Sequence, residues 1–127
     1  MIFGIGTDIV SYSRIHDMHE HYGERLARRL LSDAELAEYA TSFDPARFLM
    51  RRFAAKEAFS KALGTGIRAP ANWHGVWVIN HRSGKPQLEF SVELAALLRS
   101  RGILRSHLTL TDERGMAAAT VILECDG

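Results

Sequence analysis

The sequence predicts an α+β fold in a single domain over residues 1–127, with a long central helix packed on a mostly antiparallel sheet. Three observations support this prediction. A chain of 127 residues can bury one modest core. Apolar residues recur at helical spacing through the first half, whereas short strand-forming runs separated by turns fill the second. No internal repeat, low-complexity tract or linker divides the chain.

The first half predicts a strand followed by helices. Residues 2–10 form the predicted strand, and its two glycines indicate that another element approaches closely there. Helical spacing predicts one helix over residues 14–31. Ser32, followed three residues later by Glu35, is the capping-box pattern of a further short helix.

The long central helix has clear start and stop signals. Asp44 and Pro45 form an N-cap and first-turn pair. Gly64 ends the helix after Leu63, so its length is roughly 28 Å at 1.5 Å per residue. The remaining chain predicts strands at 73–80, 87–91, 108–111 and 116–124, turns at 82–85 and 112–115, and a helix at 92–101.

Composition excludes several classes of protein. Apolar residues make up 46% and charged residues 24%, as in ordinary globular domains. The N-terminus carries Asp8 and no basic leader, which favours a strand over a signal peptide, and no apolar run approaches membrane-spanning length. The single cysteine, Cys125, excludes an internal disulfide and suits a reducing compartment. We therefore expect a cytoplasmic protein with no membrane partner.

Charge is unevenly distributed. The net charge is +1, but six basic and only two acidic residues lie between Thr41 and Arg68. Such a patch attracts anions: phosphate, nucleic acid or an acidic protein. A solvated helix face is the alternative interpretation.

Four residues with chemical potential share one face of the long helix: Glu57, Ser60, Lys61 and Gly64. Steps of three, four and seven residues return to the same side of a helix. By itself, the Glu57–Lys61 spacing describes an ordinary ion pair worth about 0.3–0.5 kcal/mol. The opposite side presents the expected core stripe: Phe48, Ala55, Phe59 and Ala62.

Three further features indicate a ligand site on that face. Alanines keep the helix slender, so a neighbouring element can approach closely. The Gly64-Thr65-Gly66 loop offers backbone amides that could cradle phosphate. Asp8 lies near the end of the first strand, and with Glu57 it would suit Mg²⁺, which takes one or two carboxylates and completes its shell with water and substrate phosphate. A cap or turn role for Asp8 is the alternative.

Beyond these local arguments, the chain resembles the holo-acyl-carrier-protein synthase family of phosphopantetheinyl transferases over essentially its whole length. The resemblance rests on GIGTDIV at 4–10 with Arg14-Ile15, RRFAAKEAFSKALGTGI at 51–67, SGKP at 83–86, and HLTLTDERGMAAATVILE at 107–124. The 51–67 segment is long and specific.

This resemblance implies a function. Family members transfer the 4'-phosphopantetheine moiety of coenzyme A to a serine of apo-acyl carrier protein, releasing adenosine 3',5'-bisphosphate, in fatty acid biosynthesis. They are Mg²⁺-dependent homotrimers with active sites between subunits, and they do not act on nucleic acid.

Roles for individual residues follow from the motif match. Asp8 and Glu57 are the implied metal ligands, and Asp8, Glu57 and Lys61 the implied catalytic set. The implied coenzyme A contacts are Arg52, Ser60, Lys61, Gly64, Gly66, Ile67, Lys85, Pro86, Thr111 and Asp112. The implied carrier-docking residues are Arg14, Met18, Arg25 and Arg28. Arg52 does not share the helix face of Glu57, since it points about 140° away from Glu57 around the helix.

The chain also departs from the family pattern. Ser11 stands where many relatives have Glu, Asp112 where many have His, and Gly115-Met116 replaces a more usual aromatic element. His16 and His19 could hold a transition metal, but no third ligand lies in helical phase, so surface histidines are expected.

Several alternatives remain open. The general base is one of the carboxylates or a water, and our hypothesis is Glu57. A Mg²⁺-dependent hydrolase of nucleotide diphosphates, or a non-catalytic trimer that binds coenzyme A or the carrier, would also suit the same residues.

Overall fold

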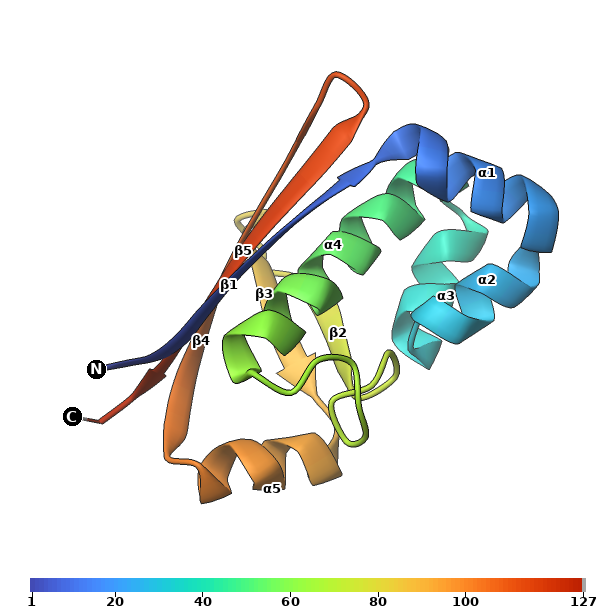
Figure 1. The fold of residues 1–127 in the computed structure, drawn as a ribbon. Helices are drawn as coiled ribbons and strands as arrows, with labels where there is room; N and C mark the ends of the chain where they lie inside the picture. The colour runs from blue at the N-terminus through green and yellow to red at the C-terminus, as the bar shows by residue number, and fades with distance from the viewer. Residues whose placement is uncertain (127) are drawn as a thin grey trace.

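The computed structural model describes residues 1–126. The elements in chain order are β1 (Ile2–Ser11), α1 (Tyr12–Tyr22), α2 (Glu24–Leu30), α3 (Asp33–Ala40), α4 (Pro45–Leu63), β2 (Val76–Asn80), β3 (Pro86–Phe90), α5 (Val92–Ser100), β4 (Ile103–Glu113) and β5 (Met116–Cys125). Helices α1 to α3 gather at one end of α4, whereas α5 lies at the other end (Figure 1). The predicted α+β class is confirmed.

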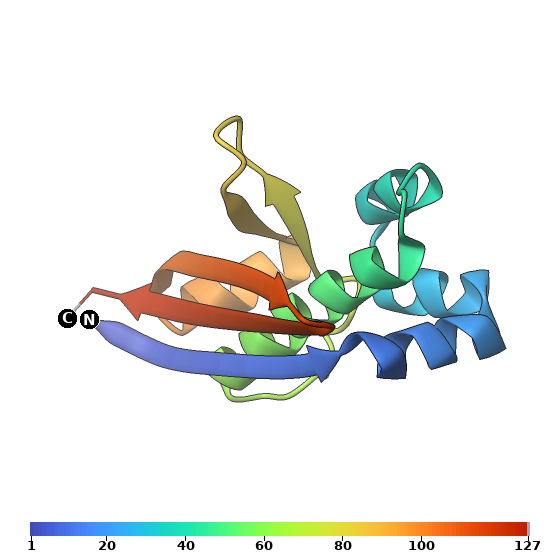
Figure 2. The same ribbon diagram turned by 90° about the horizontal axis from the view of Figure 1, so that it is seen from above.

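The main sheet has three antiparallel strands in the order β1-β5-β4. Seen from above, these strands lie over α4 (Figure 2). Strands β2 and β3 form a separate antiparallel hairpin. Asp8 on β1 lies opposite Ala119 of β5, and Asp112 on β4 lies opposite Ala117. Both acids are thus anchored to the central strand of the sheet.

Close contact between α4 and β1 depends on small residues on both elements. A Cβ on Gly4 would come 2.0 Å from the Ala62 carbonyl oxygen, and one on Gly6 would come 2.1 Å from that of Ala58. Side chains at these positions would push strand and helix apart. The predictions that the glycines mark a close approach and that the alanines permit one are confirmed, and this packing places Asp8 beside α4.

The boundaries of α4 are also confirmed. The Asp44 side chain accepts a hydrogen bond from the Arg47 amide at the start of the helix. Gly64 ends it in the left-handed region, with φ 87°. Ala55, Phe59 and Ala62 of the predicted core stripe are buried, whereas Phe48 is only half-buried.

The prediction of one helix over residues 14–31 is wrong. Gly23, with φ 59°, ends α1, and its amide donates to the His19 carbonyl. Helix α2 then begins at Glu24 in a new direction (Figure 1). Periodicity continued across the break because both helices bury apolar residues in the same core. Strand β4 is also longer than the predicted 108–111, since it pairs with β5 along its whole length.

One face of the sheet packs on α4, and the other is exposed and partly apolar. Phe3, Ile5 and Ile9 of β1 alternate with the inward residues, and both isoleucines are 63% exposed. No helix within the described residues is long and apolar enough to cross a membrane.

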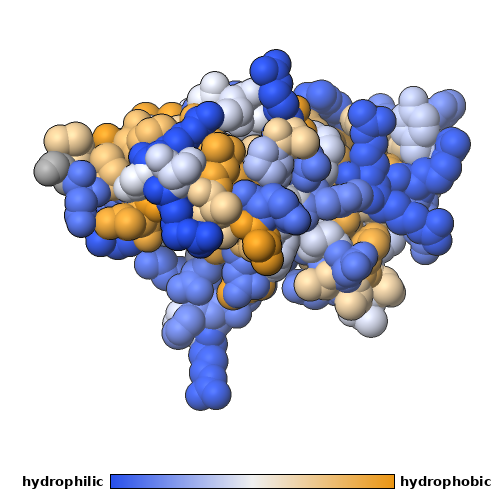
Figure 3. All heavy atoms as spheres, turned by 90° about the horizontal axis from the view of Figure 1, so that it is seen from below, coloured by the Kyte–Doolittle hydropathy of each residue, from blue (hydrophilic) through white to orange (hydrophobic). Residues whose placement is uncertain are grey.

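The opposite side of the molecule differs in character. Viewed from below, hydrophilic surface prevails over the helical end on the right, and the β2–β3 hairpin projects as a hydrophilic arm (Figure 3). Lys85 lies next to the turn of this arm and is exposed.

Candidate active site

The structure brings together the three residues predicted to be catalytic. The Lys61 ammonium crosses from α4 to β1, where Nζ lies 3.2 Å from Asp8 Oδ1 and donates to the Thr7 carbonyl at 3.0 Å. Within residues 1–126, Lys61 therefore pairs with the strand rather than with Glu57 one turn before it. The intrahelical ion pair is not formed, and Lys61 instead ties α4 to β1 at the site.

Asp8 has one oxygen without a partner. Its side chain is only 14% exposed, and Oδ2 is buried with no hydrogen-bond partner among the described residues. A buried carboxylate oxygen is costly unless something pairs with it. A cation is the partner that best suits this oxygen, because Lys61 already uses the other one.

The charges of Asp8 and Lys61 also act on the Glu57 carboxyl. Burial raises its pKa, and the negative charge of Asp8 raises it further, while Lys61 and Arg14 oppose the rise. Two carboxylates that repel each other beside a lysine and an unpartnered oxygen fit Mg²⁺. No group of three His, Cys, Asp or Glu side chains in residues 1–126 could hold a metal unaided, so substrate or water would complete the shell.

Ser60 does not share the open face that its spacing predicted. Its side chain is 1% exposed, and Oγ donates to the Glu57 carbonyl within α4. The loop that follows is open: Gly64 and Gly66 are exposed and Ile67 is half-buried. Contact with a phosphate is therefore available to the loop, but not to the Ser60 hydroxyl.

Asp112 lies at the other end of α4. Its carboxylate accepts hydrogen bonds from Arg47 at 2.9 Å and from Arg51 at 3.1 Å. These arginines hold the pKa of Asp112 below its ordinary value, chiefly through the hydrogen bond from Arg47. Arg47 and Gly64 are separated by about 26 Å along the helix. The predicted coenzyme A contacts therefore do not converge within one chain.

Arg52 and Lys56 are not part of an exposed basic patch. Arg52 is 4% exposed and Lys56 is fully buried. Arg52 donates to Glu38 at 3.3 Å and lies 3.5 Å from Glu35, and Lys56 Nζ lies 2.6 Å from Glu35. The expected anion-attracting patch loses two of its six bases in this way, because internal carboxylates neutralise them. This placement does not support the coenzyme A contact expected of Arg52.

Sequence reasoning missed the role of Glu35. The predicted capping box with Ser32 is present. Glu35 is nevertheless fully buried, and it also accepts from the Val78 amide at 3.0 Å. A capping pattern gives no sign that the carboxylate continues inward to Lys56, which lies 21 residues later in the chain.

Two of the predicted carrier-docking residues, Met18 and Arg25, line a hollow of about 500 Å³ between α1, α2 and α4, whereas Arg28 lines a different hollow. The first of these hollows is lined by Met18, Tyr22, Arg25, Leu26, Arg29, Leu30, Phe53 and Trp73. The Arg14 guanidinium lies over the ring of Phe53, and the Arg25 guanidinium lies over the ring of Tyr22; both rings line the hollow. An apolar floor with a basic rim suits an acidic protein surface with a projecting apolar side chain.

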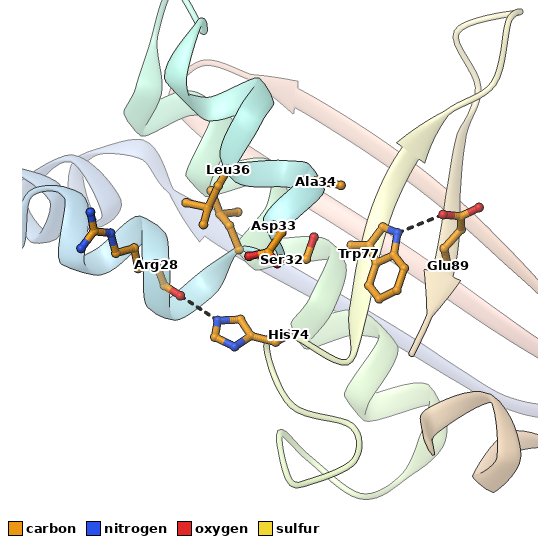
Figure 4. A pocket seen from close by; sticks show the side chains of 9 residues that line it. Arg28, Ser32, Asp33, Ala34, Leu36, His74, Trp77 and Glu89 are labelled. Atoms are coloured by element: carbon orange, nitrogen blue, oxygen red, sulfur yellow. Dashed lines mark hydrogen bonds between the residues drawn. The ribbon is translucent and has the colours of Figure 1, made fainter. Parts of the chain in front are cut away.

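A larger hollow, about 740 Å³, lies between α2, α3 and the β2–β3 hairpin (Figure 4). Apart from Arg28, its lining includes none of the residues predicted for catalysis, coenzyme A or the carrier. The size of a hollow therefore does not lead to the residues predicted for catalysis.

The fold and these residues define an α+β protein in which an acidic pair and a lysine lie together between α4 and β1. A family model for the 4'-phosphopantetheinyl transferase superfamily matches residues 4–119. The chain is 54% identical to the holo-[acyl-carrier-protein] synthase of Nitrosospira multiformis, covering 98% of this chain and 99% of that one. It belongs to the 4'-phosphopantetheinyl transferase superfamily, among the holo-[acyl-carrier-protein] synthases.

Solved structures agree. The crystal structure of the Neisseria meningitidis holo-[acyl-carrier-protein] synthase matches with a TM-score of 0.95 at 40% identity, over 98% of this chain and 99% of that one. The Bacillus anthracis synthase in complex with coenzyme A (3',5'-ADP) matches with a TM-score of 0.81 at 34% identity, over 99% of each chain.

Proposed function

We propose that this chain transfers the 4'-phosphopantetheine moiety of coenzyme A to a serine of apo-acyl carrier protein, in fatty acid biosynthesis in the cytoplasm. The products are holo-acyl carrier protein and adenosine 3',5'-bisphosphate. The observation that carries the proposal is the buried, unpartnered Oδ2 of Asp8 beside Glu57 and Lys61, in a chain of this family.

Asp8 and Glu57 are the residues that would hold Mg²⁺. When bound, the ion would offset the negative charge of the coenzyme A diphosphate. The Lys61 ammonium, half-exposed and already directed at Asp8, supplies a second positive charge at the same place. Phosphoryl transfer depends on such alignment and charge neutralisation more than on covalent help from the protein.

Glu57 is our candidate for the general base. The carrier serine oxygen bonds to the phosphorus that bears the pantetheine, and the bond from that phosphorus to the bridging oxygen breaks. The leaving adenosine 3',5'-bisphosphate takes the electron pair, and Glu57 accepts the serine proton. A carboxyl whose pKa is raised by burial and by Asp8 is better matched to that task than an ordinary surface glutamate.

Coenzyme A contacts are proposed in two separate groups. Lys61, Gly64, Gly66 and Ile67 serve the diphosphate and pantetheine, with Ser60 shaping the helix beneath them. Lys85, Pro86, Thr111 and Asp112 serve the nucleotide. Since one chain does not bring both groups together, the site is completed by a neighbouring subunit.

A homotrimer is the assembly proposed for this purpose. The outward sheet face, with Phe3, Ile5 and Ile9 exposed, is the apolar surface available for self-association. Carrier docking is proposed on α1 and α2 through Arg14, Met18, Arg25 and Arg28, of which Met18 and Arg25 line the apolar hollow.

Intact mass of an apo-acyl carrier protein, after incubation with this protein, coenzyme A and Mg²⁺, tests the function. Transfer makes the carrier heavier by one phosphopantetheine arm. Free phosphopantetheine with an unmodified carrier would instead indicate a hydrolase, and an unchanged carrier with intact coenzyme A would indicate a binding protein.

A further inference from the structure

Lys56 is the one lysine of the described residues that is fully buried, and the proposed chemistry does not use it. Its Nζ donates to the Leu30 carbonyl at 2.7 Å, to Glu35 Oε1 at 2.6 Å and to the Trp73 carbonyl at 2.7 Å. All three donor positions of the ammonium are thus used. Burial lowers the pKa of Lys56, and the Glu35 carboxylate opposes that change. Lys56 joins α4 to three other parts of the chain.

One of these bonds, together with a bond from His74, holds the end of α2. This helix has only seven residues, too few to be stable alone, and its last carbonyls need partners. Lys56 Nζ donates to the Leu30 carbonyl, and His74 Nε2 lies 2.7 Å from the Arg28 carbonyl oxygen. Figure 4 shows the His74 ring directed at that carbonyl. Side chains from α4 and from the 73–74 segment therefore fix the C-terminal end of α2.

Helix α2 also carries Arg25 and Arg28, and Lys56 directly precedes Glu57 in α4. We propose that Lys56 is a positioning residue for the carrier, and that His74 assists it from the solvent side of α2. Together they fix the docking surface of α2 relative to Glu57. This inference rests on the proposed function, because it assumes that the carrier docks on α2.

The positioning role predicts which kinetic constant changes. Without the Lys56 or His74 bond, the end of α2 is released, so Arg25 and Arg28 meet the carrier in many arrangements. The proposed coenzyme A contacts lie on elements other than α2, so loss of these bonds leaves them in place. The KM for the carrier should therefore rise, whereas the KM for coenzyme A should not.

The experiment compares Lys56→Met, His74→Ala and His74→Gln with the wild-type protein. For the first two variants we expect the carrier KM to rise about tenfold, with the coenzyme A KM within about twofold of wild type. Glutamine can donate from nearly the position of the histidine Nε2, so His74→Gln should restore much of the affinity. Amide exchange across residues 27–31, measured without carrier, should speed up in His74→Ala.

Leu49→Ala is the matched control, since Leu49 is a fully buried α4 residue with no part in these bonds. It should lower stability without raising the carrier KM. A carrier KM that rises equally in Leu49→Ala, or that stays unchanged in folded His74→Ala, overturns the proposal. His74 is exposed, so this variant decides the question even if Lys56→Met does not fold.

Failure of the proposed function would look different. The wild-type protein would then form no holo-carrier at all. The exchange measurement would still show whether Lys56 and His74 fix α2.

Discussion

Lys61 Nζ lies 3.2 Å from Asp8 Oδ1, and this contact joins the long helix to the edge strand at the place where the proposed reaction occurs. The pair contributes little to the stability of the fold, because the lysine side chain is 52% exposed. Its main effect is to place a positive charge at the site. Lys61 is held beside Asp8 while keeping access to a ligand.

Replacing Lys61 by methionine tests this division of roles. We expect the transfer rate to fall by about 100-fold or more, as for other lost charge-stabilising donors. The free energy of unfolding should change by less than about 1 kcal/mol. Steady-state kinetics and denaturant unfolding measure the two quantities. Arg99→Met, which removes an exposed base on α5, should change neither quantity. A Lys61→Met variant that keeps its activity would show that Lys61 has no role in the mechanism.

Gly6→Ala should separate β1 from α4. The new Cβ would meet backbone atoms of Ala58 and Ala62 at 2.1 and 2.6 Å, and backbone cannot move aside as a flexible side chain can. We expect a loss of about 2 kcal/mol or more in the free energy of unfolding. Thr109→Ala, at an exposed position on β4, should stay within about 0.5 kcal/mol of wild type. Equal stability of the two variants would mean that the contact of strand and helix is looser than described.

The pH dependence of stability should report Asp112. Its folded pKa lies below the ordinary value because Arg47 and Arg51 donate to it. The stabilisation is therefore fully present above the unfolded pKa and is lost as the pH falls through the folded one. Wild type should exceed Asp112→Asn in stability at neutral pH, and the difference should shrink below about pH 4. Thermal unfolding of both proteins across that range measures it, and a difference that grows on acidification would contradict the ion-pair assignment.

Much of this fold was predictable from particular residues. The capping box of Ser32 and Glu35 and the Asp44–Gly64 limits of α4 were predictable because they depend on neighbours in sequence. Gly4 and Gly6 indicated a close contact, although not with which element.

What the sequence did not reveal depends on contacts between distant residues. Gly23 turns the chain within a region whose apolar spacing continues, so periodicity could not show the break. Glu35 neutralises Lys56 from 21 residues away, and Asp8 attracts Lys61 away from its helical neighbour Glu57. Ser60 shares the helical phase of Glu57, yet the packing of α4 buries it.

The trimer proposal predicts a change in size for a surface variant. Ile5→Lys or Ile9→Lys places a charge on the exposed apolar sheet face, where burial against another subunit would be unfavourable. Wild type should behave in light scattering as three chains of 14.2 kDa, and either variant as a smaller species with reduced transfer activity. Val92→Lys, at an exposed apolar position on α5, is the control and should remain trimeric. A wild-type monomer with full activity would refute the intersubunit site.

Glu57→Gln tests the central claim, that the carboxylates on α4 and β1 form the site of transfer. Burial and Asp8 raise the pKa of Glu57, so its charge is unfavourable in the folded state, and the neutral variant should be at least as stable as wild type above the folded pKa.

The most direct measurement is the rate of holo-carrier formation by Glu57→Gln with coenzyme A and Mg²⁺, followed by intact mass. We predict a rate about 100-fold or more below wild type, with the KM for coenzyme A changed by less than about threefold. A folded Glu57→Gln protein that transfers the arm at near the wild-type rate would contradict the account.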